Sequence, residues 1–195
     1  MAHLWRRIFK KETPQDNLPV RMIRPNLDNI PEYDLPPSYT IRHYQPGDEL
    51  AWERIHVEAD QYNPVTPELF QQQFGQDVKL LAERQFYLCD AAGQAIGTAS
   101  AWLDIYQGQP YGRVHWVALV PSRQGQGLAK PLLSVVCRRL RELQHDRAYL
   151  STSTARIPAI GLYLKFGFRP HVRSEQEFQA WRRVWEKLGS NNIPA

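Results

Sequence analysis

The fold is decided by residues 113–170, RVHWVALVPSRQGQGLAKPLLSVVCRRLRELQHDRAYLSTSTARIPAIGLYLKFGFRP. Residues 113–120 read as a strand, 147–153 as a short strand, and 157–166 as a short helix ended by Gly167. Between the two strands, apolar residues recur at the i, i+4, i+7, i+8 spacing of an amphipathic helix: Leu128, Leu132, Val135, Val136, Leu140 and Leu143. The stretch therefore predicts a strand–helix–strand–helix segment of an α/β domain.

The loop before the long helix carries the first chemical signal. Gly125 and Gly127 let the backbone turn tightly and approach a ligand without a Cβ in the way. The loop ends at a helix N-terminus, where free N–H groups and the helix dipole favour an anion such as pyrophosphate. The sequence has no GxxxxGK[ST], and the loop lacks the third glycine of GxGxxG, so P-loop and dinucleotide-binding readings fit poorly.

Two motifs in this stretch resemble signatures of the GNAT acetyltransferases. Residues 124–129 resemble the acetyl-CoA-binding motif Q/R-x-x-G-x-G/A, and residues 159–168 resemble the second signature, A-x-x-L-Y-x-x-x-G-F. Their order and separation also fit, and the resemblance covers roughly residues 39–172. It implies a GNAT-like α/β fold, in which helices flank a central, mostly antiparallel mixed sheet of about six to seven strands.

The resemblance also implies a function and a set of site residues. It implies acetyl-CoA as co-substrate and transfer of its acetyl group to a primary amine by direct attack in a ternary complex. Tyr163 matches the tyrosine that protonates the departing thiolate, a role that suits a phenol. Backbone groups of Val117, Ala118 and Leu119 match those that pair with the pantetheine arm. The loop residues that match the pyrophosphate cradle are Gln124, Gly125, Gln126, Gly127, Leu128, Ala129 and Lys130.

Three positions depart from the family pattern. Arg156 stands where many members have an asparagine that contacts pantetheine; it could reach a phosphate or the substrate, or form a surface pair. Arg113 stands where some members place a glutamate base. His115 is expected to share a strand face with Arg113, Val117 and Leu119, and resembles a histidine that arylalkylamine acetyltransferases use to draw off a proton through water. A hydrogen-bonded packing role for His115 stays open.

The acceptor and the alternative functions are less constrained. The aromatic-rich half around Trp52, Tyr62 and Trp102 fits a small-molecule amine or a peptide N-terminus, although core packing explains these rings equally well. The other function class is a non-catalytic acyl-CoA-binding or partner-docking module on the same fold. Cys89 and Cys137 lie in apolar segments, which argues against an acyl-carrying thiol. The histidines lack metal spacing, so no metal site is expected.

The rest of the chain predicts a domain with two appendages. Six prolines in the first 40 residues predict an extended, basic arm over 1–38 with no central strand. The domain proper is expected over 39–173, and a C-terminal helix and tail over 174–195. Within the domain we expect strands at 39–43, 85–89, 95–105 and 168–172 and a loop at 106–111. Helices are expected at 49–58, capped by Asp48, and at 66–81, with a possible break at Gly75.

Composition excludes several other classes. Six of the 24 basic residues but only two of the 20 acidic ones fall in residues 1–24, so the remaining chain is balanced and a nucleic-acid interface is not expected. A mean hydropathy of −0.52 and the lack of a long apolar run predict no membrane span. The first eleven residues have too short an apolar run for a secretory signal, and cysteine usage fits a reducing cytoplasm. A homodimer through a helix bearing Trp181 and Trp185 is possible.

Overall fold

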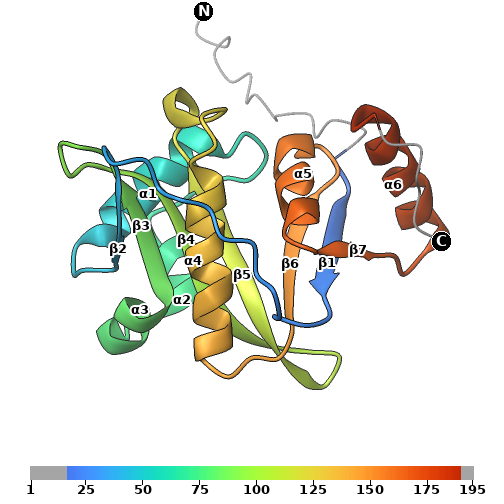
Figure 1. Ribbon diagram of the computed structural model, residues 1–195, viewed down its shortest axis with the longest axis horizontal. Helices are drawn as coiled ribbons and strands as arrows, with labels where there is room; N and C mark the ends of the chain where they lie inside the picture. The colour runs from blue at the N-terminus through green and yellow to red at the C-terminus, as the bar shows by residue number, and fades with distance from the viewer. Residues whose placement is uncertain (1–16, 190–195) are drawn as a thin grey trace, which may run out of the picture.

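The computed structural model describes residues 17–189, which form one seven-stranded sheet with helices on it (Figure 1). The strand order is β2-β3-β4-β5-β6-β1-β7, and only the β5–β6 pair is parallel. The strands are β1 Pro19–Arg24, β2 Thr40–His43, β3 Gln85–Cys89, β4 Ala95–Tyr106, β5 Gln109–Leu119, β6 Ala148–Ser153 and β7 Arg169–His171. The expected mixed, mostly antiparallel sheet is confirmed.

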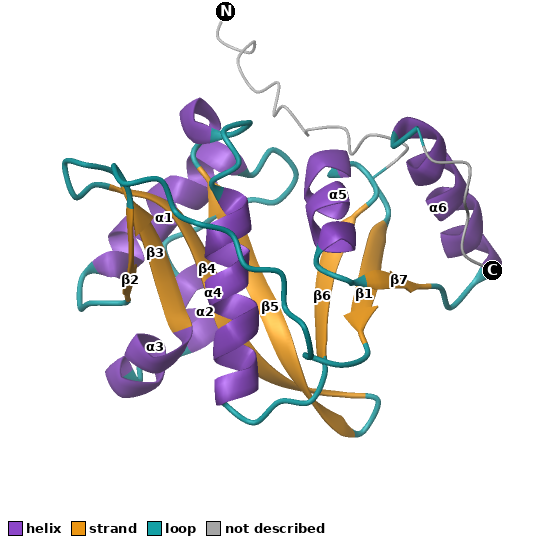
Figure 2. Ribbon diagram, viewed as in Figure 1, coloured by secondary structure: helices purple, strands orange, loops and turns teal. Residues whose placement is uncertain are grey.

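Helices pack on both faces of the sheet. The helices are α1 Asp48–Ala59, α2 Leu69–Phe74, α3 Val78–Arg84, α4 Ala129–Glu142, α5 Ile157–Lys165 and α6 Glu175–Lys187, with a 3₁₀ turn η1 at Pro121–Arg123. Helix α4 crosses one face of β3–β5, and α1 packs on the other face of β4 and β5 (Figure 2). The face of α4 toward the sheet is fully buried through Leu132, Leu133, Val136, Cys137 and Leu140. The apolar periodicity in the sequence correctly predicts this helix.

The N-terminal segment departs most from the sequence prediction. We expected no central strand before residue 39, but β1 lies inside the sheet and pairs antiparallel with both β6 and β7. Its prolines do not interrupt the ladder, because Pro19 is the first residue of the strand and Pro25 follows its last residue. Val20 and Met22 enter the core on one face, while Arg21 and Ile23 point to the other. Residues 25–38 then run extended along α4, where the Ser134 hydroxyl donates to the Pro31 carbonyl.

Two smaller expectations are wrong and one is confirmed. The expected loop at 106–111 is instead the continuation of the β4–β5 hairpin, which turns at Gln107 and Gly108 with φ of 52° and 73°. Asp48 is the first residue of α1, not its cap; its carboxylate pairs with Arg42 and accepts from the Gln45 N–H. The helical stretch after Thr66 does break at Gly75, into α2 and α3.

Helix α6 uses its aromatic face inside the chain. Trp181 and Trp185 are almost fully buried, and Trp181 belongs to the main hydrophobic core. The surface that the sequence offered for a homodimer is therefore occupied by intramolecular packing. No helix within residues 17–189 is long and apolar enough to cross a membrane.

Candidate active site

Strands β5 and β6 pair over a short stretch and then diverge. They pair only at Gly112–Ala148 and Arg113–Tyr149, and beyond these residues they diverge, as Figure 1 shows. We call this divergence the β5–β6 fork. Because no strand within residues 17–189 lies against this edge of β5 past Arg113, the backbone groups of residues 114–119 that point away from β4 are left free to bind an extended ligand. Val117, Ala118 and Leu119, the residues expected to contact pantetheine, lie on this edge.

A β-bulge reorients the side chains of β5 within the fork. Thr98 pairs with Ala118 but Ser100 pairs with His115, so one extra residue is inserted in β5. Trp116 takes up the extra residue with a φ of 48°, unusual for a side chain of this size. His115 therefore shares its face with Ala118, and the expectation that it shares a face with Val117 and Leu119 is wrong. Strict alternation fails at the bulge.

The bulge sends both His115 and Trp116 toward α1 and α2. The His115 ring centroid lies 5.3 Å from that of Phe74, and the Trp116 indole lies 5.0 Å from Trp52 and 4.9 Å from His56. Burial lowers the pKa of His115 well below its usual value, and the charge of Arg113 lowers it further. His115 is therefore neutral at pH 7, and so is His56, whose pKa burial also lowers. His115 thus does not titrate near neutral pH, where a free histidine does.

His56 is a residue that the sequence did not single out. Burial lowers its pKa to about 3, and its Nε2 is buried without a hydrogen-bond partner. A signal was present, since Trp52 and His56 are four residues apart and lie on one side of α1, and Asp60 follows the end of the helix. The sequence alone does not show that this side of α1 meets the bulge of β5.

The glycine loop is shaped as an open cradle at the end of β5. Gly125 and Gly127 have φ of 75° and 79°, and no heavy atom lies within 4 Å of the position a Cβ would take at either. Helix α4 starts without a side-chain cap, so N–H groups of its first turn have no side-chain acceptor. Free donors, the helix dipole and open space together suit an anion such as pyrophosphate.

The other loop residues hold this cradle in place. Gln124 donates from Nε2 to the Leu119 carbonyl (2.9 Å), Gln126 donates to Ser122, and Leu128 is buried in the core. Ala129 is the first residue of α4, and Lys130 follows it with its ammonium 5.2 Å from the ring of Tyr33. The structure thus brings the whole predicted stretch from Gln124 to Lys130 together at one end of the fork.

Tyr163 lies buried on α5, the helix that follows β6. Its ring meets Phe168 edge-on at 6.2 Å, and burial raises the pKa of its hydroxyl to about 12 despite the opposing charge of Arg156. A phenol with this pKa keeps its proton at neutral pH, so Tyr163 is present as the protonated form that a general acid requires. The arrangement fits a general acid.

Arg156 lies at the start of α5 and forms an ion pair. Its Nη2 lies 2.8 Å from both carboxylate oxygens of Asp60, and its guanidinium lies 5.4 Å from the ring of Tyr62. Asp60 also accepts from the backbone N–H groups of Tyr62 and Asn63, and its pKa is lowered. Arg156 thus joins the start of α5 to the α1–α2 loop, and of the readings open to it the structure favours the ion pair.

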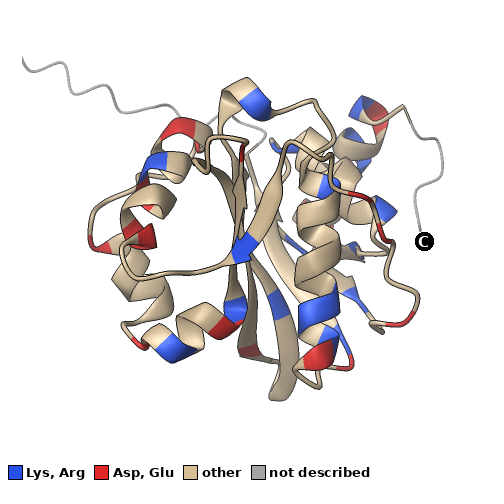
Figure 3. Cartoon of the chain, turned by 60° about the vertical axis from the view of Figure 1, so that its left-hand side comes forward, with Lys and Arg blue, Asp and Glu red and all other residues tan. Residues whose placement is uncertain are grey.

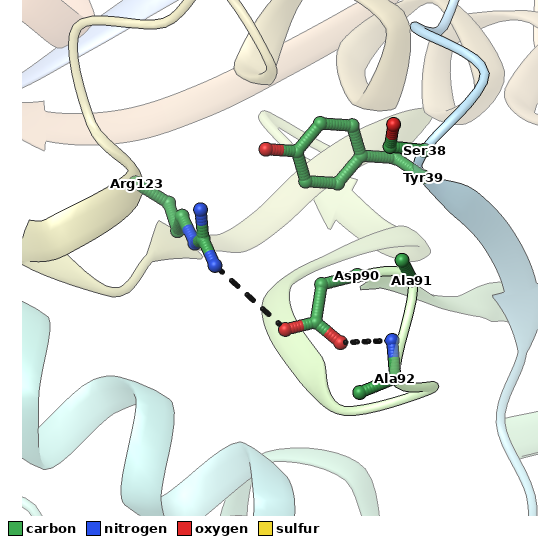
Figure 4. A pocket seen from close by; sticks show the side chains of 6 residues that line it. All are labelled: Ser38, Tyr39, Asp90, Ala91, Ala92 and Arg123. Atoms are coloured by element: carbon green, nitrogen blue, oxygen red, sulfur yellow. Dashed lines mark hydrogen bonds and ion pairs between the residues drawn. The ribbon is translucent and has the colours of Figure 1, made fainter.

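A separate pocket of about 280 Å³ lies near the glycine loop but holds none of the predicted site residues. It is lined by Ser38, Tyr39, Asp90, Ala91, Ala92 and Arg123 (Figure 4). Arg123 reaches toward Asp90 across it at 3.9 Å, and Asp90 also accepts from the Ala92 N–H. These contacts brace η1 against the β3–β4 turn. Among residues 17–189, no group of three or more His, Cys, Asp or Glu could hold a metal ion.

Comparison with known proteins agrees with this geometry. Residues 48–168 match the family model described as the acetyltransferase (GNAT) family. Mycothiol acetyltransferase of Thermomonospora curvata is 30% identical over 160 residues, covering 76% of this chain and 50% of that protein. The corresponding enzyme of Streptomyces griseus is 28% identical over 147 residues, covering 73% and 47%. The chain spans about half the length of the curated relatives it matches.

A solved structure extends the match to three dimensions. The GCN5-related N-acetyltransferase from Sphaerobacter thermophilus superposes with a TM-score of 0.62 at 25% identity, covering 80% of this chain and 50% of that one. Its likeness confirms the GNAT fold expected from the two motifs. The chain therefore belongs to the GNAT acetyltransferase family.

Proposed function

We propose that this chain transfers an acetyl group from acetyl-CoA, the donor that the family uses, to the primary amine of a small molecule or a peptide N-terminus. The observation that carries the proposal is that the free edge of β5 is followed, after η1 and the glycine loop, by the uncapped N-terminus of α4. A strand edge followed by an anion site suits an extended, amide-bearing arm that ends in a pyrophosphate.

The residues of the chain divide the work of binding. Backbone groups of Val117, Ala118 and Leu119 pair with the pantetheine arm and place one N–H at the thioester carbonyl, where it stabilises the oxyanion. Backbone N–H groups of residues 125–127 and the first turn of α4 hold the pyrophosphate, and Lys130 adds a positive charge nearby.

The chemistry follows from the two buried titratable groups. The amine nitrogen forms a bond to the carbonyl carbon and gives up a proton to neutral His115, directly or through water. The C–S bond then breaks, and the sulfur takes the proton of Tyr163. Transfer is direct because both cysteines are buried, and burial raises the pKa of Cys137 to about 12, which leaves it unreactive.

The proposal is tested by incubating the chain with acetyl-CoA and a panel of primary amines. The panel holds aliphatic and aromatic amines, short peptides with free N-termini, and an acceptor of the mycothiol type, after the name of the matching relatives. We expect release of the CoA thiol together with a matching acetylated product by mass spectrometry. Tight binding of acetyl-CoA without turnover on any amine would instead support a non-catalytic acyl-CoA-binding module.

A further inference from the structure

Strand β1 has one covered, buried face and one partly exposed face. On the covered face, Val20 and Met22 of β1 are buried in the main core. On the opposite face, Arg21 and Ile23 are partly exposed, and the neighbouring Ser151 of β6 is exposed. This second face looks to the same side of the sheet as His115, since Tyr149 pairs with Arg113, two residues before it.

Arginines and tyrosines gather on this open face. Tyr106, Tyr111 and Tyr149 pack ring against ring, with Tyr106 and Tyr149 stacked at 5.0 Å. Arginine side chains lie over these rings: Arg21 is 4.7 Å from Tyr106, Arg113 is 5.6 Å from Tyr149, and Arg147 is 4.6 Å from Tyr111. Arg169 of β7 pairs with Ile23, which packs against the same rings. We call the three tyrosines and the four arginines Arg21, Arg113, Arg147 and Arg169 the arginine–tyrosine face.

Positive charge on the arginine–tyrosine face exceeds the negative charge that balances it. Asp104 pairs with Arg113 at 3.2 Å and also accepts from the Tyr149 hydroxyl. Within residues 17–189, no carboxylate lies within 4 Å of the guanidinium groups of Arg21, Arg147 or Arg169. In Figure 3, by contrast, lysines and arginines are interspersed with acidic residues over the elements in view.

Polar atoms at this face also lack partners. The Tyr106 hydroxyl, Arg113 Nε and His171 Nε2 are buried and accept or donate no hydrogen bond within the described chain. His171 contacts Tyr106 edge-on at 5.8 Å and pairs with Arg21 across β1 and β7. Such unsatisfied groups are costly. These atoms are themselves buried, so an anion on this face would be bound by the more exposed guanidinium groups of Arg21 and Arg169.

The arginine–tyrosine face adjoins the point of acetyl transfer. Arg113 and Tyr149 form the last pair before the β5–β6 fork opens, and His115 lies two residues further, roughly 7 Å along the strand. An acceptor whose amine reaches the fork from this side lays the rest of its length over β6, β1 and β7. We infer that the acceptor is an amine that also carries a carboxylate or phosphate, bound here by Arg21 and Arg169. The inference rests on the proposed function.

The test compares acceptors that differ only in this charge. Tetraglycine is paired with tetraglycinamide, and Gly-Gly-Gly-phosphoserine amide with Gly-Gly-Gly-Ser amide, with kcat/KM expressed per concentration of free amine. At roughly 3.3 Å per residue these peptides are long enough to reach from the fork over strands spaced about 4.8 Å apart. We expect the anionic member of at least one pair to be preferred tenfold or more, mainly through KM, because charge-assisted hydrogen bonds lower the free energy of binding. The preference should shrink as salt is added. The pair that shows it distinguishes a carboxylate acceptor from a phosphate acceptor.

Substitutions test whether the arginines of this face cause the preference for the anionic acceptor. In Arg21→Gln/Arg169→Gln we expect the preference to fall below threefold while rates with neutral amines stay within twofold. If the double variant is unstable, Arg169→Gln alone is used in its place, because Arg169 is exposed and the substitution perturbs the fold less. Arg141→Gln, an exposed arginine on α4, is the matched control and should keep the preference.

Two outcomes would overturn the inference. Neutral amines used as well as their anionic partners would do so, as would a preference that survives in both variants. If the chain acetylates no amine, the proposed function fails first; calorimetric binding of the same acids then decides this inference separately, and no binding, or equal binding to the double variant, refutes it.

Discussion

The free edge of β5 and the face of the sheet that carries His115 offer a ligand different kinds of groups. The site that we propose for the donor (the donor side) consists of backbone: an unpaired strand edge, two glycines with positive φ, and an uncapped helix start. The site that we propose for the acceptor (the acceptor side) consists of side chains: His115, Trp116 and His56 around the bulge, and the arginine–tyrosine face beyond it. Backbone recognition needs a fixed spacing of small residues and therefore leaves a motif. Side-chain recognition depends on which residues distant strands bring together.

The donor side can be broken by one side chain. Gly127→Glu adds a bulky side chain in a left-handed conformation and a negative charge where an anion must sit. In the unmodified chain, acetyl-CoA at a hundredfold excess over Kd stabilises the fold by about 2.7 kcal/mol, roughly 5–10 °C in Tm for this size. We expect Gly127→Glu to abolish that shift, as measured by thermal unfolding.

The matched control for this variant is Gly108→Glu. Gly108 also has a positive φ and open space around its Cβ position, but it lies at the β4–β5 turn. It should keep the full shift in Tm. If a folded Gly127→Glu protein keeps the shift too, the glycine loop is not the pyrophosphate site.

A smaller but specific loss is expected from Tyr163→Phe. The ring and its contact with Phe168 stay, but the proton for the leaving thiolate is gone. We expect kcat to fall ~10²-fold or more where chemistry limits the rate, with the affinity for acetyl-CoA nearly unchanged, since this interaction forms in the transition state.

The control removes another buried phenol hydroxyl, in Tyr87→Phe on β3, which hydrogen-bonds Gln85 far from the fork. This variant should lose stability but little kcat. Full kcat in Tyr163→Phe, with chemistry shown to limit the rate, would remove Tyr163 from the mechanism.

The acceptor side predicts a pH dependence that differs from that of a free histidine. Because burial lowers the pKa of His115, its neutral, proton-accepting form persists to well below pH 6.5. The limb of kcat/KM that reports His115 should therefore lie well below pH 6.5, and above it the rate should follow deprotonation of the acceptor amine. His115→Gln should remove that acidic limb and lower kcat/KM by ~10²-fold, the low end for a general base.

A limb centred near pH 6.5 in the pH–rate profile would show that His115 is hydrated in the working enzyme. A loss below about threefold in His115→Gln, with an unchanged profile, would return His115 to a packing role.

The sequence predicted the helix order and the glycine loop before α4, and it failed where distant segments meet. The 3.6-residue period identified α4, and the two motifs identified its loop and Tyr163. The segment Val20–Ile23 alternates like a strand, but its place between β6 and β7 depends on partners about 130 residues away. The bulge at Trp116 is similarly hidden, because no local signal marks a tryptophan for positive φ. Both features that the sequence did not predict, strand β1 and the bulge at Trp116, belong to the part of the sheet where we place the acceptor.

The central claim is that acetyl-CoA binds along the edge of β5 and over the start of α4. Amide chemical shifts of ¹⁵N-labelled protein, recorded as acetyl-CoA is added, test it directly. The account predicts that the largest changes fall on residues 117–119 and 125–130, and that α6 and the β4–β5 turn stay unchanged. Saturable shifts centred elsewhere, with residues 125–130 unmoved, would contradict it.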